Sequence, residues 1–153
     1  MIDDEHSSDG EILTGLVLEI FRLNGRLLTA GDRLIADVGL TSARWQVLGA
    51  IHYADEPQTV SWLARSMGLT RQAVQRIVNE LEVAGLVAFK ANPSHRRAQL
   101  VMLTRNGQSA YAAADRRQKP WANALAKNFK RADLAAAQVL LAKIRGKLEA
   151  DTE

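Results

Sequence analysis

The 153-residue sequence contains no cysteine, so disulfide bonds, thiolate metal sites and cysteine-based redox sensing are excluded. No apolar run approaches the roughly 18 to 20 residues that a membrane-spanning helix needs. The first ten residues are acidic, whereas a secretory leader would be basic and then apolar. We therefore expect a cytoplasmic protein that has no membrane partner.

The common signatures of enzymes are missing too. The chain has no glycine-rich phosphate-binding loop, no cysteine nucleophile and no clustered pair of histidine and acid. Its three histidines, at positions 6, 52 and 95, show no metal-ligand spacing. We expect no catalytic residues, no metal and no cofactor.

Positive charge is concentrated in the middle of the chain. Residues 59–105 include seven basic and two acidic side chains, whereas the rest of the chain has 13 basic and 15 acidic ones. This distribution is expected of a segment that meets phosphates, although a solvated basic surface would give the same count.

The spacing of apolar residues predicts a largely helical chain. Residues 11–36 form one long amphipathic pattern, and threonines at 41, 59, 70 and 104 stand where helix N-caps are wanted. The helix that follows Thr104 should run to about Lys119, where Pro120 must kink it or begin a new helix. A last helix is expected over residues 133–149.

Two of these helices have the spacing of a helix-turn-helix. Residues 60–67 and the helix after Thr70, ending by Gly85, are separated by about three residues that include Gly68. Residues 86–90 and 100–103 then read as two short strands around a turn, which makes a β-hairpin, or wing. The expected fold is mostly α with a small β-hairpin wing.

The second helix of this pair has two faces of opposite chemistry. One face is apolar, and the other carries side chains that can hydrogen-bond base edges or phosphates in the major groove. The predicted DNA-binding residues of this helix are Thr70, Arg71, Gln72, Gln75, Arg76 and Asn79. The acids Glu80 and Glu82 are expected to lie remote from the DNA. The alternative is that this face is only the solvated side of an amphipathic helix.

The wing carries a matching set of basic side chains. Two guanidinium groups on a protruding loop can enter a narrow minor groove or contact its phosphates, although exposed arginine pairs are also common on other surfaces. The predicted DNA-binding residues of the wing are Lys90, His95, Arg96 and Arg97.

The two ends of the chain carry apolar stripes that the helix-turn-helix and wing between them are too small to cover. We expect them to interleave with a second copy, while an intramolecular bundle is the alternative. The predicted organisation is a flexible acidic N-terminus (1–10), a dimerisation helix (11–38), a winged helix-turn-helix domain (39–104) and C-terminal dimerisation helices (105–153).

The order of these parts resembles the multiple-antibiotic-resistance regulator (MarR) family of winged-helix transcription factors. The resemblance is carried by LTSARWQVLGAI, TVSWLARSMGLTRQAVQRIVNELEVAGLV and NPSHRRAQLVMLTRNG, and it covers nearly the whole chain. It implies a dimer whose recognition helix, residues 70–84, enters the major groove of DNA while the wing touches the minor groove.

The resemblance also implies a crevice that responds to a small aromatic or anionic effector. Arg44, Trp45 and His52 lie near that expected crevice, although each is also explained as a structural residue. The family usually has an Asp-x-Arg arrangement at the wing, but here His95 takes the place of the acid, with Arg97 at the arginine position. The ion pair that orients the wing arginine is therefore absent. A neutral His95 could still hydrogen-bond, and a protonated one would add a phosphate contact.

These observations predict a sequence-specific regulator, a repressor that binds a palindromic operator on double-stranded DNA as a homodimer and is released by an effector. The alternative is a winged-helix architectural or protein-interaction module without effector response. An enzyme is the most remote reading.

Overall fold

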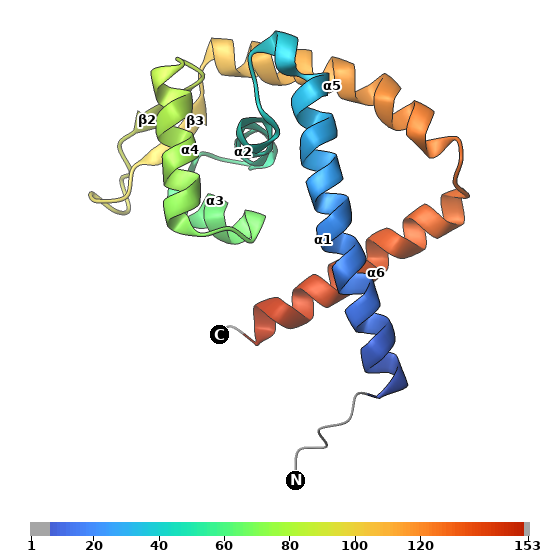
Figure 1. Ribbon diagram of the computed structural model, residues 1–153. Coiled ribbons are helices and arrows are strands. Elements are labelled where there is room, and N and C mark those ends of the chain that lie inside the picture. The colour runs from blue at the N-terminus through green and yellow to red at the C-terminus, as the bar shows by residue number, and fades with distance from the viewer. Residues whose placement is uncertain (1–6, 152–153) are drawn as a thin grey trace. The chain divides into compact units, whose positions relative to one another are not determined.

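The computed structural model of the chain describes residues 7–151 (Figure 1). The chain divides into two compact units, and the boundary in the sequence falls between Asp115 and Arg116. Residues 1–6 of the expected flexible N-terminus lie outside the described residues, and Ser8 already begins the first helix. The elements are α1 (Ser8–Leu34), the short 3-10 helix η1 (Ala36–Val38), α2 (Ser42–Tyr53), β1 (Gln58–Thr59), α3 (Val60–Met67), α4 (Arg71–Val83), β2 (Val87–Lys90), β3 (Leu100–Leu103), α5 (Arg105–Ala126) and α6 (Arg131–Ala150). The predicted fold class, mostly α with a small β-hairpin wing, is confirmed.

Threonine side chains cap the starts of four helices, as the sequence predicts. The hydroxyls of Thr41, Thr59, Thr70 and Thr104 accept hydrogen bonds from the backbone amide three residues further on, at 3.3, 3.2, 3.2 and 3.0 Å. Each hydroxyl satisfies an amide that has no partner within its own helix. Gly68 ends α3 with a φ of 66°, a left-handed conformation that glycine adopts without steric cost. The caps thus fix the joint between α3 and α4.

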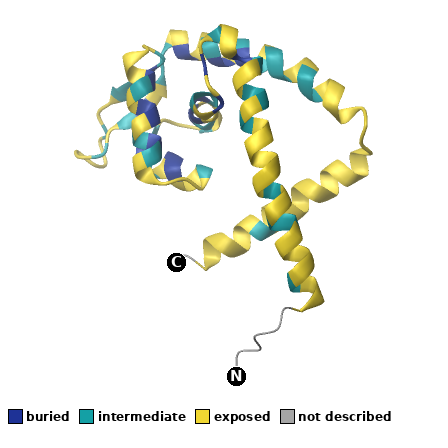
Figure 2. Ribbon diagram, viewed as in Figure 1, coloured by how far each residue is buried: buried dark blue, intermediate teal, exposed yellow. Residues whose placement is uncertain are grey.

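The core of the first unit is apolar. Its largest fully buried side chains are Ile35, Val47, Leu48, Leu63, Val74, Val78, Leu81 and Val101. Burying one such side chain stabilises the fold by about 1.5 to 3 kcal/mol. The buried residues gather in α2, α3, α4 and the sheet (Figure 2). This core holds α4 by one face only.

The sheet has three antiparallel strands in the order β1-β3-β2. In the wing, Val87 pairs with Leu103 and Lys90 with Leu100. The expected hairpin is confirmed, but β1 was not predicted. This two-residue strand is defined by its pairing with β3, for which a local pattern gives no signal.

A second connection that was not predicted ties the end of α1 to the start of α2. Ser42 is buried, its hydroxyl donates to the Leu28 carbonyl at 2.8 Å, and its amide donates to Asp32 Oδ1 at 2.7 Å. A Cβ at Gly31 would meet the Ser42 hydroxyl, so glycine allows this close approach. The contact fixes where α2 begins.

Helix α5 does not end near Lys119 or restart at Pro120; it continues without interruption to Ala126. Proline removes the hydrogen bond that its amide would donate to the Arg116 carbonyl. Because Pro120 is exposed, its ring meets solvent instead of a packed neighbour, and the helix tolerates the loss.

The two long terminal helices bury none of their residues within the single chain (Figure 2). Their exposed apolar side chains include Ile12, Leu23, Leu27, Leu134, Leu141 and Leu148. Across residues 7–151, no helix combines the length and the apolar character that crossing a membrane would require.

Candidate nucleic-acid interface

Helix α4 presents one apolar and one polar face, as its sequence predicts. Val74, Ile77, Val78 and Leu81 are buried. On the opposite side, Arg71, Gln72, Arg76 and Asn79 are exposed, and Gln75 is half-buried. The polar side chains that could touch nucleobases are therefore accessible in this chain.

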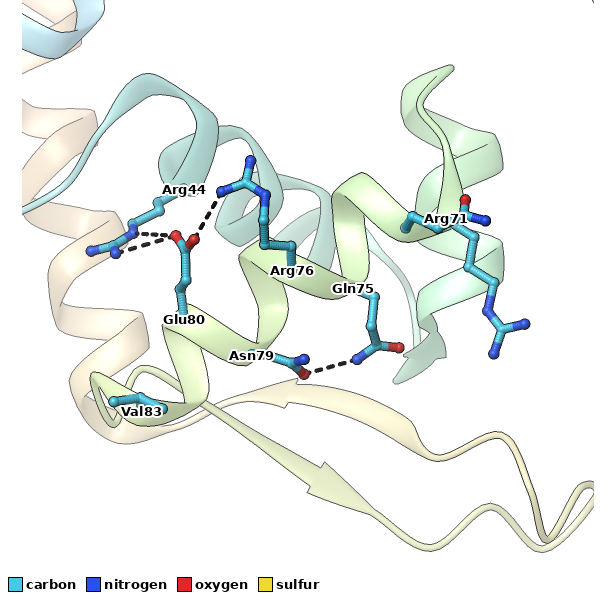
Figure 3. A pocket seen from close by; sticks show the side chains of 8 residues that line it. Arg44, Arg71, Gln75, Arg76, Asn79, Glu80 and Val83 are labelled. Carbon is cyan, nitrogen blue, oxygen red and sulfur yellow. Dashed lines mark hydrogen bonds and ion pairs between the residues drawn. The ribbon is translucent and has the colours of Figure 1, made fainter.

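The amide side chains on this face bond to each other. Gln75 Nε2 donates to Asn79 Oδ1 at 2.9 Å across one helical turn (Figure 3). The remaining amide groups of the pair are free to meet a ligand, and the mutual bond aligns both side chains along the helix. Together with Arg44 from α2, this face lines an open hollow of about 810 Å³.

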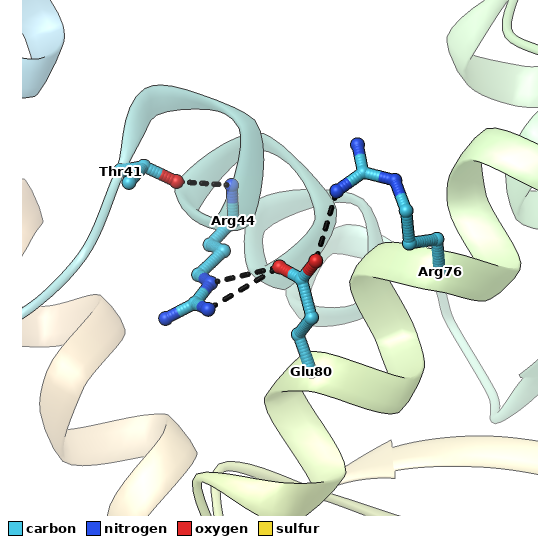
Figure 4. Close-up of polar contacts among 4 residues, drawn as sticks. All are labelled: Thr41, Arg44, Arg76 and Glu80. Atoms are coloured by element: carbon cyan, nitrogen blue, oxygen red, sulfur yellow. Dashed lines mark hydrogen bonds and ion pairs between the residues drawn. The ribbon is translucent and has the colours of Figure 1, made fainter.

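Glu80 corrects the expectation that the acids of α4 stand apart from the DNA-facing side chains. Its Oε1 accepts a hydrogen bond from Arg76 Nη1 at 2.8 Å, and its Oε2 accepts from Arg44 Nε at 3.3 Å and from Arg44 Nη2 at 3.2 Å (Figure 4). The helical period brings residues i and i+4 onto the same face, so Glu80 lies beside Arg76. Glu82, in contrast, is exposed and makes no contact of this kind with any residue between 7 and 151.

The ion pair between Arg76 and Glu80 contributes little to stability. The Arg76 side chain is 68% exposed, and a solvated pair at i,i+4 stabilises a helix by only about 0.3 to 0.5 kcal/mol. The contact therefore matters more for where the guanidinium points than for how firmly α4 folds.

The wing residues predicted to bind DNA, Lys90, His95, Arg96 and Arg97, are all exposed. Among residues 7–151, neither His95 nor Arg97 forms an ion pair with an acid. Arg97 lines a small hollow of about 210 Å³ together with Arg71 and Gln75 of α4. The fold thus brings one wing arginine and the start of α4 to one place.

Asn92 shapes the wing from within the turn that the sequence predicts between the two strands. Its side chain accepts a hydrogen bond from the Ser94 amide at 3.0 Å and donates one to the Ala98 carbonyl at 2.9 Å. An asparagine that bridges a turn in this way limits the freedom of the loop. The bridge supplies local order to the loop that carries His95, Arg96 and Arg97.

Several cations of this surface have no acidic partner. Within residues 7–151, Arg71, Lys90, Arg96 and Arg97 form no ion pair or side-chain hydrogen bond. Unpaired guanidinium and ammonium groups leave a positive field that attracts phosphates. The arrangement suits a polyanion.

The structure does not bring the three candidate effector residues together. Arg44 turns toward Glu80, Trp45 is half-buried against the core, and His52 stacks on Tyr111 with ring centroids 4.4 Å apart. Only His52 of the three lines a second hollow, of about 490 Å³, between the end of α2, β3 and α5.

Tyr111 forms the buried wall of this second hollow. Burial, and next its hydrogen bond and proximity to Tyr53, raise the pKa of Tyr111 above its ordinary value. The charged residues that line the hollow are both acids, Asp55 and Glu56. The site therefore combines aromatic surface with negative charge.

A helix-turn-helix with an exposed polar second helix and a basic hairpin defines a winged-helix DNA-binding fold. The profile of the MarR family matches residues 38–98. The chain belongs to the MarR family of transcription regulators.

Two curated relatives are similar over most of the chain. An uncharacterized protein of Mycobacterium tuberculosis is 42% identical over 102 residues, which cover 67% of this chain and 70% of the relative. The transcriptional activatory protein BadR of Rhodopseudomonas palustris is 27% identical over 111 residues, covering 71% of this chain and 63% of BadR.

Among solved structures, the repressor CouR bound to a 23-mer DNA duplex has a TM-score of 0.76 and 25% identity, covering 92% of this chain and 99% of CouR. CouR from Rhodococcus jostii bound to p-coumaroyl-CoA gives a TM-score of 0.74 at 25% identity, covering 93% of this chain and 95% of that CouR chain. The winged-helix fold is therefore shared along nearly the full chain.

Proposed function

We propose that this chain is a sequence-specific regulator that binds a palindromic operator on double-stranded DNA. The observation that carries the proposal is the exposed polar face of α4, where arginine and amide side chains match the hydrogen-bonding groups of guanine and adenine. In this arrangement α4 lies in the major groove, with Arg71, Gln72, Gln75, Arg76 and Asn79 toward the bases and Thr70 at the flanking phosphate.

The wing supplies the second contact. Lys90, His95, Arg96 and Arg97 are exposed, and the three that carry a permanent charge have no acidic partner among the described residues. They bind the phosphates and the minor groove beside the α4 site. Each phosphate neutralised adds about −0.9 to the slope of log affinity against log salt.

The protein acts as a homodimer in this proposal, with residues 11–38 and 105–153 forming the dimerisation region and residues 39–104 the DNA-binding domain. The support is that α1 and α6 bury none of their residues in the single chain. Two heads held about 34 Å apart read the two halves of a palindrome.

Repression is the direction that we propose, since CouR, which shares the fold, is a repressor. BadR, in contrast, is named as an activator. A bound dimer represses where it covers a promoter, so the position of the operator decides between the two. The same family membership supports a non-enzymatic role.

A small effector releases the DNA. CouR binds p-coumaroyl-CoA, and the hollow beside His52 and Tyr111 is a candidate site for an aromatic compound here. Because Asp55 and Glu56 are the charged residues of its lining, this hollow favours a neutral or cationic aromatic compound over an anion. Arg44 and Trp45 lie outside it.

The test begins with selection of duplexes from a randomised library by the purified protein. Arg76→Ala is expected to weaken binding to the enriched duplex and to relax the preference at one base pair, by about 1 to 3 kcal/mol. Arg97→Ala is expected to weaken binding evenly across sequences and to reduce the salt slope by about one. Arg22→Ala, which removes the same charge from α1 outside the DNA-binding domain, is the control, and the oligomeric state of each variant is measured by light scattering.

Two results would contradict the proposal. If the selection enriches no palindrome over random duplex at a controlled salt concentration, the chain is an architectural or interaction module instead. If Arg76→Ala and Arg97→Ala bind the enriched duplex like the parent, the assigned contacts are wrong.

A further inference from the structure

Glu80 connects two arginines from different helices, and each of its oxygens serves one of them. Oε1 receives Arg76 Nη1 at 2.8 Å, and Oε2 receives the Nε and Nη2 groups of Arg44 at 3.3 and 3.2 Å (Figure 4). The Glu80 and Arg44 side chains are about one third exposed, whereas that of Arg76 is 68% exposed. One carboxylate oxygen is therefore bound by the less exposed Arg44, and the other oxygen accepts from the more exposed Arg76.

The hydrogen bond to Glu80 leaves the Nε and Nη2 groups of Arg76 free to contact a base. A guanidinium has five N–H donors in a fixed plane. Because Nη1 is engaged, Nε and Nη2 remain as an adjacent pair, which matches the two acceptors of guanine, O6 and N7. Fixing one nitrogen of a planar group also restricts the plane of the other two.

Arg44 keeps Glu80 in place from outside the recognition helix. It lies in the first turn of α2, where its own backbone amide donates to the Thr41 hydroxyl at 3.3 Å. The hydrogen bonds from Arg44 Nε and Nη2 to Glu80 join α2 to α4 across 36 residues of sequence. The orientation of Arg76 thus depends on a side chain that need not touch DNA.

We propose that Glu80, held by Arg44, is a positioning residue that orients Arg76 and so sets the base preference at one position of the operator. This inference rests on the proposed DNA-binding function and adds to it two residues, on two helices, that determine specificity. Glu80 achieves this at a cost in affinity, because its negative charge offsets one arginine on a surface that meets phosphates.

The opposing effects on affinity and specificity separate this role from a structural one. Removing the Glu80 charge leaves both Arg76 and Arg44 without an acidic partner, so binding to random duplex should strengthen or stay constant. Discrimination at the base pair read by Arg76 should fall, because a guanidinium without a fixed plane pairs less selectively. A variant that merely misfolds would lose both.

The experiment measures competition between the duplex enriched by the wild-type protein and its complete set of single base-pair variants, at one salt concentration. Arg76→Met first locates the base pair that this side chain reads. Glu80→Gln is then expected to lose about tenfold of the discrimination at that same base pair, with little change elsewhere. Its affinity for random duplex should not fall.

Arg44→Met is a second, independent variant. It should reduce discrimination at the same base pair, and when combined with Arg76→Met it should cause no further loss there, because Arg44 acts through Arg76. Glu82→Gln is the matched control: it removes the same charge from α4 at a carboxylate that makes no such contact, and it should leave the discrimination profile unchanged.

Three results would overturn the inference while leaving the proposed function intact. These are full discrimination in Glu80→Gln, an equal loss in Glu82→Gln, or a loss in Glu80→Gln at a base pair that Arg76→Met does not affect. The last result would mean that Glu80 accepts a hydrogen bond from a cytosine itself. If no duplex is enriched at the start, the proposed function fails and the inference fails with it.

Discussion

Gly107→Ala should destabilise the protein, although alanine is normally the better helix residue. Gly107 lies in the first turn of α5, and a Cβ there would overlap the backbone carbonyl oxygen of Leu86 and come 2.9 Å from its carbon. Leu86 follows α4, and its carbonyl accepts a hydrogen bond from the Thr104 amide at 3.1 Å. Neither backbone segment can move away without disturbing that bond.

The size of the effect follows from three contributions. Alanine in place of a helical glycine stabilises by about 0.5 to 1 kcal/mol. Inserting a methyl group into a packed contact costs about 1 to 3 kcal/mol, and weakening the bond between Thr104 and Leu86 costs up to about 0.5 to 1.5 kcal/mol. The expected net loss in the free energy of unfolding is about 1 to 3 kcal/mol.

Urea unfolding at a fixed protein concentration measures this loss. With a slope of about 1 to 3 kcal/mol per molar urea, the midpoint should fall by roughly 1 M. Gly15→Ala is the control, since a Cβ at that position of α1 meets nothing within 4 Å, and it should gain about 0.5 to 1 kcal/mol. If Gly107→Ala gains stability as Gly15→Ala does, the close approach of α5 to Leu86 is refuted.

Three further outcomes are expected. Leu81→Ala empties a fully buried site and should lower the free energy of unfolding by about 2 to 5 kcal/mol in the same urea assay, and a loss under 1 kcal/mol would count against the described core. Because burial and then Tyr53 raise the pKa of Tyr111 above 10.0, the folded state keeps that proton longer than the unfolded state; the resulting stability is complete below about pH 10 and is lost as the pH rises through the folded pKa. In Tyr53→Phe, tyrosinate absorbance should therefore appear only together with unfolding, and its appearance in the folded protein would contradict the burial. Asn92→Ala should weaken binding to the enriched duplex several-fold while leaving the urea midpoint unchanged, and an unaltered affinity would show that the wing does not need this bridge.

The parts of the fold that depend on neighbouring residues could be predicted from the sequence. A threonine followed by an apolar helical pattern specifies a start, because its hydroxyl meets an amide only three residues away. The starts at Thr41, Thr59 and Thr70 and the end at Gly68 were all obtained in this way. The polar face of α4 followed from helical periodicity in the same manner.

The features that depend on distant partners could not be predicted. Ser42 is buried because Leu28 and Asp32 receive its hydrogen bonds, and nothing in the residues around position 42 indicates this. Arg44 was predicted near an effector crevice, yet it bonds to Glu80, 36 residues away. Long-range ion pairs of this kind leave no periodic signal, so the sequence could not show that Arg76 has a neighbour that orients it.

The Thr104 hydroxyl joins the end of α4 to the start of α5. Its hydroxyl donates to the Gly85 carbonyl at the end of the recognition helix and accepts from the Gly107 amide at the start of α5. One oxygen atom therefore links the start of α5 to the end of α4, across 19 residues of sequence. A displacement at the start of α5 would therefore act on the end of α4 through this one hydroxyl.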